Sequence, residues 1–335
     1  MSGSPGEYAH EDHPVATGDV QHYGCRVPPR SRRDTDLSTV RRFASSRWGP
    51  AGNRGEPVGA NRSPALNHRA NVHNGSMCSN SRSRSWLCDM DGVLINGGTM
   101  VSGADQFLDR LRTTGQPFLV LTNNSLFTPR NLVDRLSRLG LNVDEEQLWT
   151  SALATARFVQ KQRPNGTAFV IGEDSMHDAL RRVGYREDDR APDYVVLGET
   201  QNYSFGDFST AIGLIERGSR FVATNPESTG PGPTGSLPGC GAIAKLIQSA
   251  TGVAPYFVGK PNTVMIREGM DMLGAHATST VMVGDRLETD ILAGVEAGLE
   301  TILVLSGVTR PDQIDRLPYR PSRVVGSVAD LLDEI

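Results

Sequence analysis

The 335-residue chain is poor in lysine, aromatic residues and cysteine, and it has no long apolar run. No run approaches the ~18 apolar residues that a membrane-spanning helix needs. Residues 1–30 carry charges and prolines where a secretion signal needs an apolar stretch. We therefore expect no membrane association and a cytoplasmic location. Lysine occurs only at Lys161, Lys245 and Lys260, so a lysine at a chemically useful position is conspicuous.

The small number of cysteines excludes a disulfide-stapled scaffold. Cys25, Cys78, Cys88 and Cys240 share no metal-ligand spacing, and Cys88 lies in an apolar run. We expect free thiols in a reducing compartment. The length of the chain predicts about two domains, with enough residues for a buried core.

The formal net charge of −4 hides an asymmetry between two parts of the chain. Residues 1–84 contain 12 arginines and 7 acidic residues (+5), whereas residues 85–335 contain 22 basic and 31 acidic residues (−9). A body of that charge repels a polyanionic backbone, so we expect it to bind no nucleic acid. Residues 1–84 also contain only two Leu and no Ile among 9 Gly and 7 Pro. Such a segment buries too little apolar surface to order itself, which predicts a disordered N-terminal extension.

From Ser85 onward, short apolar runs alternate with amphipathic stretches, which predicts an α/β fold with a parallel sheet. The predicted buried strands of the main sheet are Trp86–Cys88, Phe118–Leu121, Thr280–Val283 and Thr301–Leu305. The predicted helices beside them are Ala104–Thr113, Pro129–Leu139, Ser151–Gln160, Thr263–Leu273 and Thr289–Ala297. A second alternation has strands at Ala168–Ile171, Tyr194–Leu197 and Phe221–Thr224, with helices near Asp174–Val183, Phe208–Arg217 and Gly241–Ser249.

The first predicted strand ends in two acids, Asp89 and Asp91. Open α/β sheets bind ligands at the carboxyl ends of their strands. Two carboxylates so close together are costly unless a cation or a shared proton relieves them. Mg²⁺ suits this position because it takes oxygen ligands and keeps waters that a phosphate can replace. By itself, the pair is equally compatible with a solvated turn.

Three further groups follow other predicted strands or precede helices. Thr122, Asn123 and Asn124 end the second strand with a hydroxyl and successive backbone N–H groups, an arrangement suited to phosphate oxygens. Lys260 stands before another helix. A third strand ends in Gly284 and Asp285, with Asp290 five residues later. Each group alone is a weak signal, but their succession at strand ends predicts one phosphate and metal site.

This succession resembles the haloacid dehalogenase (HAD) superfamily of phosphotransferases, over nearly all of residues 85–335. The matching motif residues are Asp89 with Asp91, Thr122, Lys260, and Asp285 with Asp290. The resemblance implies a Rossmann-like core and a nucleophile at Asp89 that forms an aspartyl-phosphate, with Asp91 as general acid and base. An acid at this second position favours hydrolysis over the chemistry of transport ATPases or C–Cl dehalogenases.

The resemblance also implies the ligands of the metal and of the phosphoryl group. Asp89, the backbone carbonyl of Asp91, and Asp285 would hold Mg²⁺, with Asp290 and Gly284 in supporting positions. Thr122 and Lys260, together with Asn123 and Asn124, would bind the transferring phosphoryl group.

The spacing of the motifs indicates where a cap is inserted. About 30 residues separate Asp91 from Thr122, too few for a cap, whereas about 138 separate Thr122 from Lys260 and contain their own alternation. The predicted division is an extension at 1–84, a Rossmann-like core at 85–164 and 255–335, and an α/β cap at 165–254.

The cap resembles the NagD-like branch of the superfamily, called class IIA. The resemblance lies in the runs Val222–Glu227 and Leu237–Ala242. That branch usually has Asp where Glu227 stands. Asn225 and Glu227 either contact the substrate from the cap, in which case their substitution changes the ranking among phosphate esters, or form a strand-end turn.

We interpret the chain as a Mg²⁺-dependent phosphatase that hydrolyses small phosphomonoesters of the phosphoglycolate, sugar phosphate or p-nitrophenyl phosphate type. Its expected partner is a small phosphorylated metabolite, and self-association stays open. One alternative is a nucleoside monophosphate phosphatase. Another is a protein that binds phosphate esters on the same fold as a sensor, which Asp91 disfavours because a pure binder needs no general acid.

Overall fold

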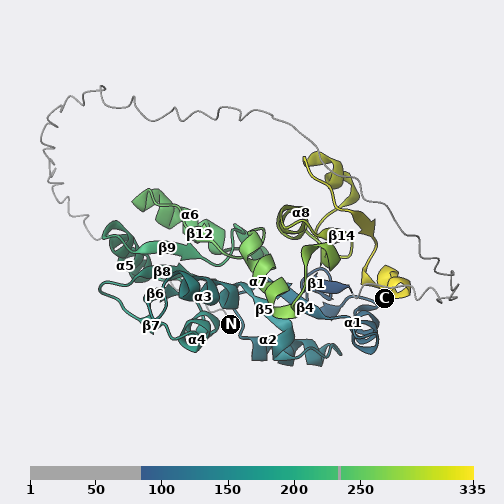
Figure 1. Cartoon of the computed structure of the whole chain (residues 1–335). Coiled ribbons are helices and arrows are strands. Elements are labelled where there is room, and N and C mark those ends of the chain that lie inside the picture. Colours follow the sequence, from purple (N-terminus) through teal and green to yellow (C-terminus); the bar gives the residue numbers. More distant parts are fainter. Residues whose placement is uncertain (1–83, 233–234) are drawn as a thin grey trace, which may run out of the picture. The chain divides into compact units, whose positions relative to one another are not determined.

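The computed structural model describes residues 84–232 and 235–335, and it contains two parallel sheets flanked by helices (Figure 1). The predicted disordered extension lies outside the described residues, apart from Arg84. No helix in the described part of the chain is both long and apolar enough to cross a membrane.

The larger sheet has six parallel strands in the order β15-β14-β13-β1-β4-β5. Their bounds are Arg323–Val325, Glu300–Val304, Thr280–Gly284, Ser85–Asp89, Phe118–Thr122 and Leu148–Thr150, in that order. The four strands predicted for this sheet are confirmed to within a residue at either end. Because all six run the same way, the chain segments that follow β1, β4 and β13 meet at one edge.

Helices cover both faces of the larger sheet. They are α1 (Ala104–Thr113), α2 (Pro129–Arg138), α3 (Ser151–Gln162), α7 (Thr263–Leu273) and α8 (Leu292–Glu296). Side chains alternate across a strand. Trp86 and Cys88 of β1 are buried in a core with residues of α1 and α2, whereas Leu87 is buried on the other face with residues of α3 and α7. The sheet is therefore the middle of three layers, with helices packed on both of its faces. Cys88 is a core residue with a free thiol.

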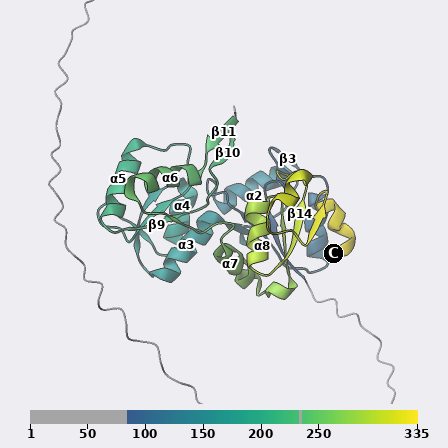
Figure 2. The same cartoon turned by 90° about the horizontal axis from the view of Figure 1, so that it is seen from above.

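The smaller sheet has five parallel strands in the order β12-β9-β8-β6-β7. Their bounds are Tyr256–Phe257, Arg220–Ala223, Tyr194–Leu197, Thr167–Ile171 and Arg186–Glu187, in that order. Helices α5 (Phe205–Glu216) and α6 (Cys240–Thr251) cover one face, and α4 (Asp174–Arg182) lies with α3 on the other (Figures 1 and 2).

The pairing of β12 bears on the predicted boundary between core and cap. Tyr256 and Phe257 of β12 pair with Val222 and Ala223 of β9. The chain therefore leaves the smaller sheet after residue 257, although the core was predicted to resume at 255. The division into a core at 85–164 and 255–335 and a cap at 165–254 stays a prediction.

Several short elements were not predicted. The antiparallel hairpins β2–β3 (Ile95–Asn96 and Thr99–Met100) and β10–β11 (Thr229–Gly232 and Gly235–Pro238; Figure 2) are too short or too rich in glycine and proline to show a period of two. The same holds for β5, β7, β12 and β15. Short 3₁₀ turns occur at Glu145–Gln147, Ala277–Ser279, Pro311–Arg316 and Val328–Glu334.

Candidate active site

Lys260 and two aspartates form a buried ionic cluster at the carboxyl edge of the larger sheet. Lys260 Nζ lies 2.6 Å from Asp89 Oδ1, at the end of β1, and 2.6 Å from Asp290 Oδ1, beyond β13. The side chain of Lys260 is only 2% exposed. The fold therefore brings together three of the predicted motif residues from segments that are far apart in the sequence.

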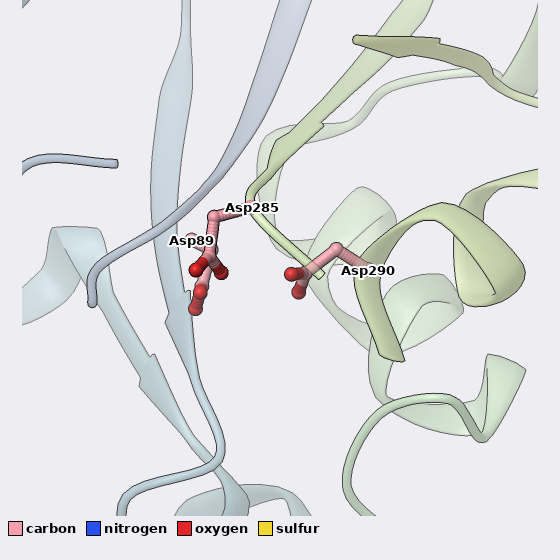
Figure 3. Close-up of side chains that lie close together, drawn as sticks. All are labelled: Asp89, Asp285 and Asp290. Atoms are coloured by element: carbon pink, nitrogen blue, oxygen red, sulfur yellow. The ribbon is translucent and has the colours of Figure 1, made fainter. Parts of the chain in front are cut away.

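Asp285, which directly follows β13, completes a group of three acids. Carboxylate oxygens of Asp89, Asp285 and Asp290 lie within 4.8 Å of one another. Figure 3 shows the carboxylates of Asp89 and Asp285 side by side, with that of Asp290 facing them from the neighbouring turn. Asp285 Oδ2 accepts a hydrogen bond from the backbone N–H of Val308 at 2.7 Å. Its Oδ1 is buried and has no hydrogen-bond partner among the described residues.

The unpartnered Oδ1 of Asp285 tests whether the site suits a cation. A buried carboxylate oxygen without a partner is costly, and native structures contain few such atoms. Three acids with one lysine leave an excess of negative charge, which a divalent cation with oxygen ligands offsets. The residues present therefore fit a hard divalent cation. The side chain of Asp91 is not part of this group among the described residues, and the contribution of its backbone carbonyl stays a prediction.

The electrostatics of the cluster follow from burial and from the crowding of acids. Burial raises the pKa of Asp89 well above its usual range, and Asp290 and Asp285 raise it further against the opposing effect of Lys260. Burial, with Asp290, also raises the pKa of Asp285 to about 6. Burial alone would lower the pKa of Lys260, but Asp290 and Asp89 together raise it above its ordinary value. The lysine is therefore charged, and additional positive charge is needed to keep all the acids ionised.

Two glycines allow the acids to approach the sheet edge. Gly284 has no room for a side chain, because a Cβ there would overlap the Cβ of Asp290. Gly92 has a φ of +85°, and a Cβ there would overlap Asp285 Oδ2. Glycine is required at both positions for steric reasons. The supporting position predicted for Gly284 thus has a physical explanation in its contact with Asp290.

Asp290 lies in a wide helical turn, which corrects the predicted helix Thr289–Ala297. The chain forms a π turn over Leu287–Ile291, and α8 begins only at Leu292. Asp290 Oδ2 accepts a hydrogen bond from the backbone N–H of Arg286 at 3.1 Å, while Oδ1 contacts Lys260. Such turns often occur at functional sites. Here the turn leaves the Asp290 side chain directed at the cluster.

Asp91 lies at the exposed side of the site. Although its side chain retains solvent contact, the surrounding protein raises its pKa by partial burial, and the positive charges of Arg135, Lys260 and Arg286 oppose this shift. A raised pKa favours the protonated form, which suits a group that must donate a proton.

Thr122 and Asn124 shape the loop after β4. Thr122 is buried, and its Oγ1 accepts a hydrogen bond from the backbone N–H of Asn124 at 3.1 Å, which leaves the hydroxyl hydrogen free to donate. Asn124 Oδ1 accepts hydrogen bonds from the backbone N–H groups of Leu126 and Phe127 at 3.0 and 3.2 Å. The Asn124 side chain therefore caps the turn rather than facing a ligand.

The side chain of Asn123 is hydrogen-bonded within the protein; the predicted phosphate contact of this residue is through its backbone N–H and stays a prediction. Its Oδ1 accepts from the backbone N–H of Lys260 at 2.8 Å. Its Nδ2 donates to the Lys260 carbonyl at 2.8 Å and to Glu227 Oε1 at 2.7 Å. Asn123 thus connects the loop after β4 to Lys260 and to the segment after β9.

Asn225 and Glu227 also have protein partners, which favours the strand-end turn of the two alternatives; a contact with the substrate stays a prediction. Glu227 Oε2 accepts from Asn225 Nδ2 at 2.9 Å, and the same Nδ2 donates to Glu199 Oε1 at 3.2 Å. Glu199 Oε2 accepts from the N–H and hydroxyl of Ser125 at 3.2 and 3.3 Å. The sequence did not single out Ser125 or Glu199, because only the fold brings the ends of β4, β8 and β9 together.

The sequence of the chain matches two family models. Residues 86–186 match the haloacid dehalogenase-like hydrolase model, and residues 257–331 match a second model of HAD-hydrolase-like proteins. The two matches include Asp89, Asp91, Thr122, Lys260 and Asp285.

Characterised relatives extend the similarity over most of the described chain. The dihydroxyacetone phosphatase of Corynebacterium glutamicum is 52% identical over 249 residues, which cover 74% of this chain and 90% of that protein. The ribonucleotide monophosphatase NagD of Escherichia coli is 42% identical over 245 residues, which cover 73% of this chain and 96% of that protein.

Solved structures share the fold. NagD from E. coli superposes with a TM-score of 0.70, and the match covers 74% of this chain and 97% of NagD at 42% identity. The p-nitrophenyl phosphatase from Archaeoglobus fulgidus superposes with a TM-score of 0.72 and covers 76% and 99% of the two chains at 33% identity. Both matches include nearly the whole of the other protein.

Proposed function

The chain belongs to the haloacid dehalogenase-like hydrolases, in their NagD-like class IIA branch, and is a phosphomonoester hydrolase; from this premise we propose that it hydrolyses small phosphorylated metabolites in the cytoplasm, with Mg²⁺, through an aspartyl-phosphate. The observation that carries this proposal is the cluster at the sheet edge. Asp89 lies 2.6 Å from Lys260 and close to Asp285, whose buried Oδ1 has no hydrogen-bond partner in the described part of the chain.

We propose that Asp89, the backbone carbonyl of Asp91, and Asp285 hold Mg²⁺, with Asp290 in a supporting position. The Oδ1 of Asp285, which lacks a hydrogen-bond partner within residues 84–232 and 235–335, and the excess of acids over lysine support this assignment. When bound, the cation would neutralise charge on the acids and on the phosphate oxygens. Asp290 also forms an ion pair with Lys260, so its carboxylate would support both the metal ligands and the lysine that binds the phosphoryl group.

Asp89 and Asp91 divide the chemistry between them in this proposal. A carboxylate oxygen of Asp89 attacks phosphorus and breaks the bond to the ester oxygen, which takes a proton from Asp91. Asp91, now ionised, accepts a proton from a water molecule that attacks the phosphoryl group on Asp89. The bond between the Asp89 oxygen and phosphorus breaks, inorganic phosphate leaves, and Asp89 is again a carboxylate while Asp91 is again protonated. The exposed position of Asp91, where water has access, supports this second role.

Thr122 and Lys260 bind the phosphoryl oxygens in this proposal. The Thr122 hydroxyl retains a hydrogen to donate, and Lys260 is charged and buried. Phosphoryl transfer depends mainly on positioning and on charge stabilisation. Lys260, fixed between two acids, therefore stabilises the transferring phosphoryl group most when its backbone and its side chain are both held in place.

We propose a three-carbon phosphate of the dihydroxyacetone phosphate type as the preferred substrate. The relative of 52% identity carries that name. In addition, residues 224–242, which reach Asn123 through Glu227, contain no aromatic and no basic side chain with which to bind a nucleobase. NagD, at 42% identity, supports a nucleoside monophosphate as the second candidate.

A screen of phosphate esters with and without Mg²⁺ tests this choice. We expect kcat/KM for dihydroxyacetone phosphate to exceed that for ribonucleoside monophosphates by about tenfold or more, a difference of about 1.4 kcal/mol in transition-state binding. p-Nitrophenyl phosphate serves as the control ester, because its leaving group needs no specific contacts. A preference for nucleotides would select the second candidate. Phosphate binding without release from any ester would instead support a sensor on this fold.

A truncated chain without residues 1–76 is expected to retain activity. The relatives and solved structures match about three quarters of this chain while covering 90% or more of their own length. All the motif residues lie beyond position 84. We expect kcat/KM to stay within about twofold of the full chain, a change below about 0.5 kcal/mol. A loss of tenfold or more would show that residues 1–76 take part in catalysis or folding.

A further inference from the structure

Five polar residues form a ring between the two sheets, which we call the junction network; hydrogen bonds join four pairs of neighbours, and the backbone between Asn123 and Ser125 closes it. They are Asn123 and Ser125 after β4, Glu199 after β8, and Asn225 and Glu227 after β9. The chemical steps described above use none of them. The ring touches the catalytic machinery at one point, where Asn123 contacts the backbone of Lys260.

The contact between Asn123 and Lys260 fixes the backbone on both sides of one residue. The Asn123 amide accepts from the Lys260 N–H and donates to the Lys260 carbonyl, each at 2.8 Å. Gly259 passes directly beside it, and a Cβ there would lie 2.6 Å from Asn123 Oδ1. The Asn123 amide therefore determines the position of the Lys260 backbone from which the lysine side chain extends.

Glu227 fixes the orientation of that amide. The Asn123 Nδ2 group has two hydrogens, one for the Lys260 carbonyl and one for Glu227 Oε1 at 2.7 Å. The Lys260 carbonyl oxygen and the Glu227 carboxylate oxygen both accept hydrogen bonds, so a flipped amide would place acceptor against acceptor at both contacts. The carboxylate of Glu227 thus keeps Asn123 Oδ1 directed at the Lys260 N–H.

The rest of the ring holds Glu227. The second oxygen of Glu227 accepts a hydrogen bond from Asn225 Nδ2, which also donates to Glu199. Asn225 is buried, with 2% of its surface exposed. Glu199 in turn accepts hydrogen bonds from Ser125, which lies in the loop after β4. The strand ends of the smaller sheet therefore set the position of Glu227 relative to Asn123.

We propose that Asn123 and Glu227 are positioning residues that act through Lys260, so that the placement of the smaller sheet's strand ends is transmitted to the lysine that binds the phosphoryl group. This inference rests on the proposed function of Lys260. It favours a positioning role for Glu227 over selection among leaving groups, because both of its oxygens accept hydrogen bonds from protein amides. Substitutions in this pair therefore lower turnover of every ester by a similar factor.

A reversal of donor and acceptor tests the pair. Asn123→Asp places a carboxylate oxygen against the Lys260 carbonyl and against Glu227, and we expect kcat for all esters to fall about 10- to 100-fold. In the double variant with Glu227→Gln, the introduced glutamine amide donates to the introduced carboxylate, and its oxygen accepts from Asn225. We expect the double variant to recover about tenfold over Asn123→Asp alone, since only the unmatched Lys260 carbonyl remains.

The readouts separate positioning from a general structural role. Affinity for inorganic phosphate in the presence of Mg²⁺, measured by calorimetry, should weaken with Asn123→Asp and recover with the double variant, while the ranking among esters stays constant. The control is Glu173→Gln, which alters an acid that bonds to Thr200 at 2.5 Å and contacts neither Asn123 nor Lys260. We expect this control to keep the wild-type phosphate affinity.

Three results would overturn the inference. They are a double variant no better than Asn123→Asp, a changed ranking among esters, or a lowered melting temperature with unchanged kcat and phosphate affinity of the folded fraction. A wild-type protein that hydrolyses no ester would instead contradict the proposed function. The phosphate affinities of the variants would still decide whether the pair positions Lys260.

Discussion

Replacement of Asp89 by Asn is expected to reduce turnover of every phosphate ester by about 10⁴-fold or more, because an amide does not attack phosphorus. The fold should survive this change. The Asn oxygen can still accept from Lys260, which now lies 2.6 Å from Asp89 Oδ1, and one like charge is removed beside Asp285 and Asp290. Phosphate release in single-turnover experiments measures the loss, and thermal unfolding measures stability.

The matched control for this variant is Asp109→Asn, which removes the same charge from the exposed surface of α1. Its turnover should equal that of the wild type. Phosphate release by Asp89→Asn at more than about one hundredth of the wild-type rate would contradict nucleophilic attack by Asp89. A melting temperature at or above that of the wild type, combined with lost turnover, would separate the chemical role of Asp89 from any role in folding.

Removal of divalent cations is the second change with a large expected effect. Exhaustive chelation should lower kcat by about 100-fold or more, and added Mg²⁺ should restore it. Three acids share the sheet edge with a single lysine, and one buried oxygen of Asp285 has no protein partner among the described residues. Mg²⁺ at about 100 times its dissociation constant should also stabilise the folded protein by about 2.7 kcal/mol, which raises the melting temperature.

Asp285→Asn provides the matching variant for the metal. We expect it to lose both the activation and the rise in melting temperature on addition of Mg²⁺. Glu268→Gln is the control, since Glu268 is also a buried acid but pairs with Arg157 and Lys161 away from the cluster. Its response to Mg²⁺ should be retained. Full activity of the wild type after exhaustive chelation would exclude the metal from the mechanism.

The order of the elements and the motif residues could be predicted from the sequence. Apolar runs of three or four residues followed by Asp89, by Thr122 and, after one glycine, by Asp285 indicate buried parallel strands with polar ends, and parallel strands place those ends at one edge. Local periodicity and composition contain this information, because burial on both faces requires an apolar run. The same residues carry the resemblance to a known family, which adds the expected role of each.

The partners of individual side chains could not be predicted in this way. Asn123 follows Thr122 and precedes a helix, a position equally suited to a phosphate contact, yet its amide binds the backbone of Lys260, 137 positions later. Glu227 and Asn225 had the residue types of substrate contacts, yet both are engaged in the junction network. The same amide or carboxylate serves either purpose, and the sequence does not record which group lies opposite it.

The sequence by itself determined where the longer strands and most of the helices form and which polar residues end the buried strands, since these follow from short-range burial patterns. Only the tertiary structure decided that β12 joins the smaller sheet, that Asp290 lies in a wide turn, and that Asn123 and Glu227 meet beside Lys260. The physical reason is that each of these depends on atoms brought together from distant segments. Hydrogen bonds between such atoms form only when the packing of two sheets has fixed their separation.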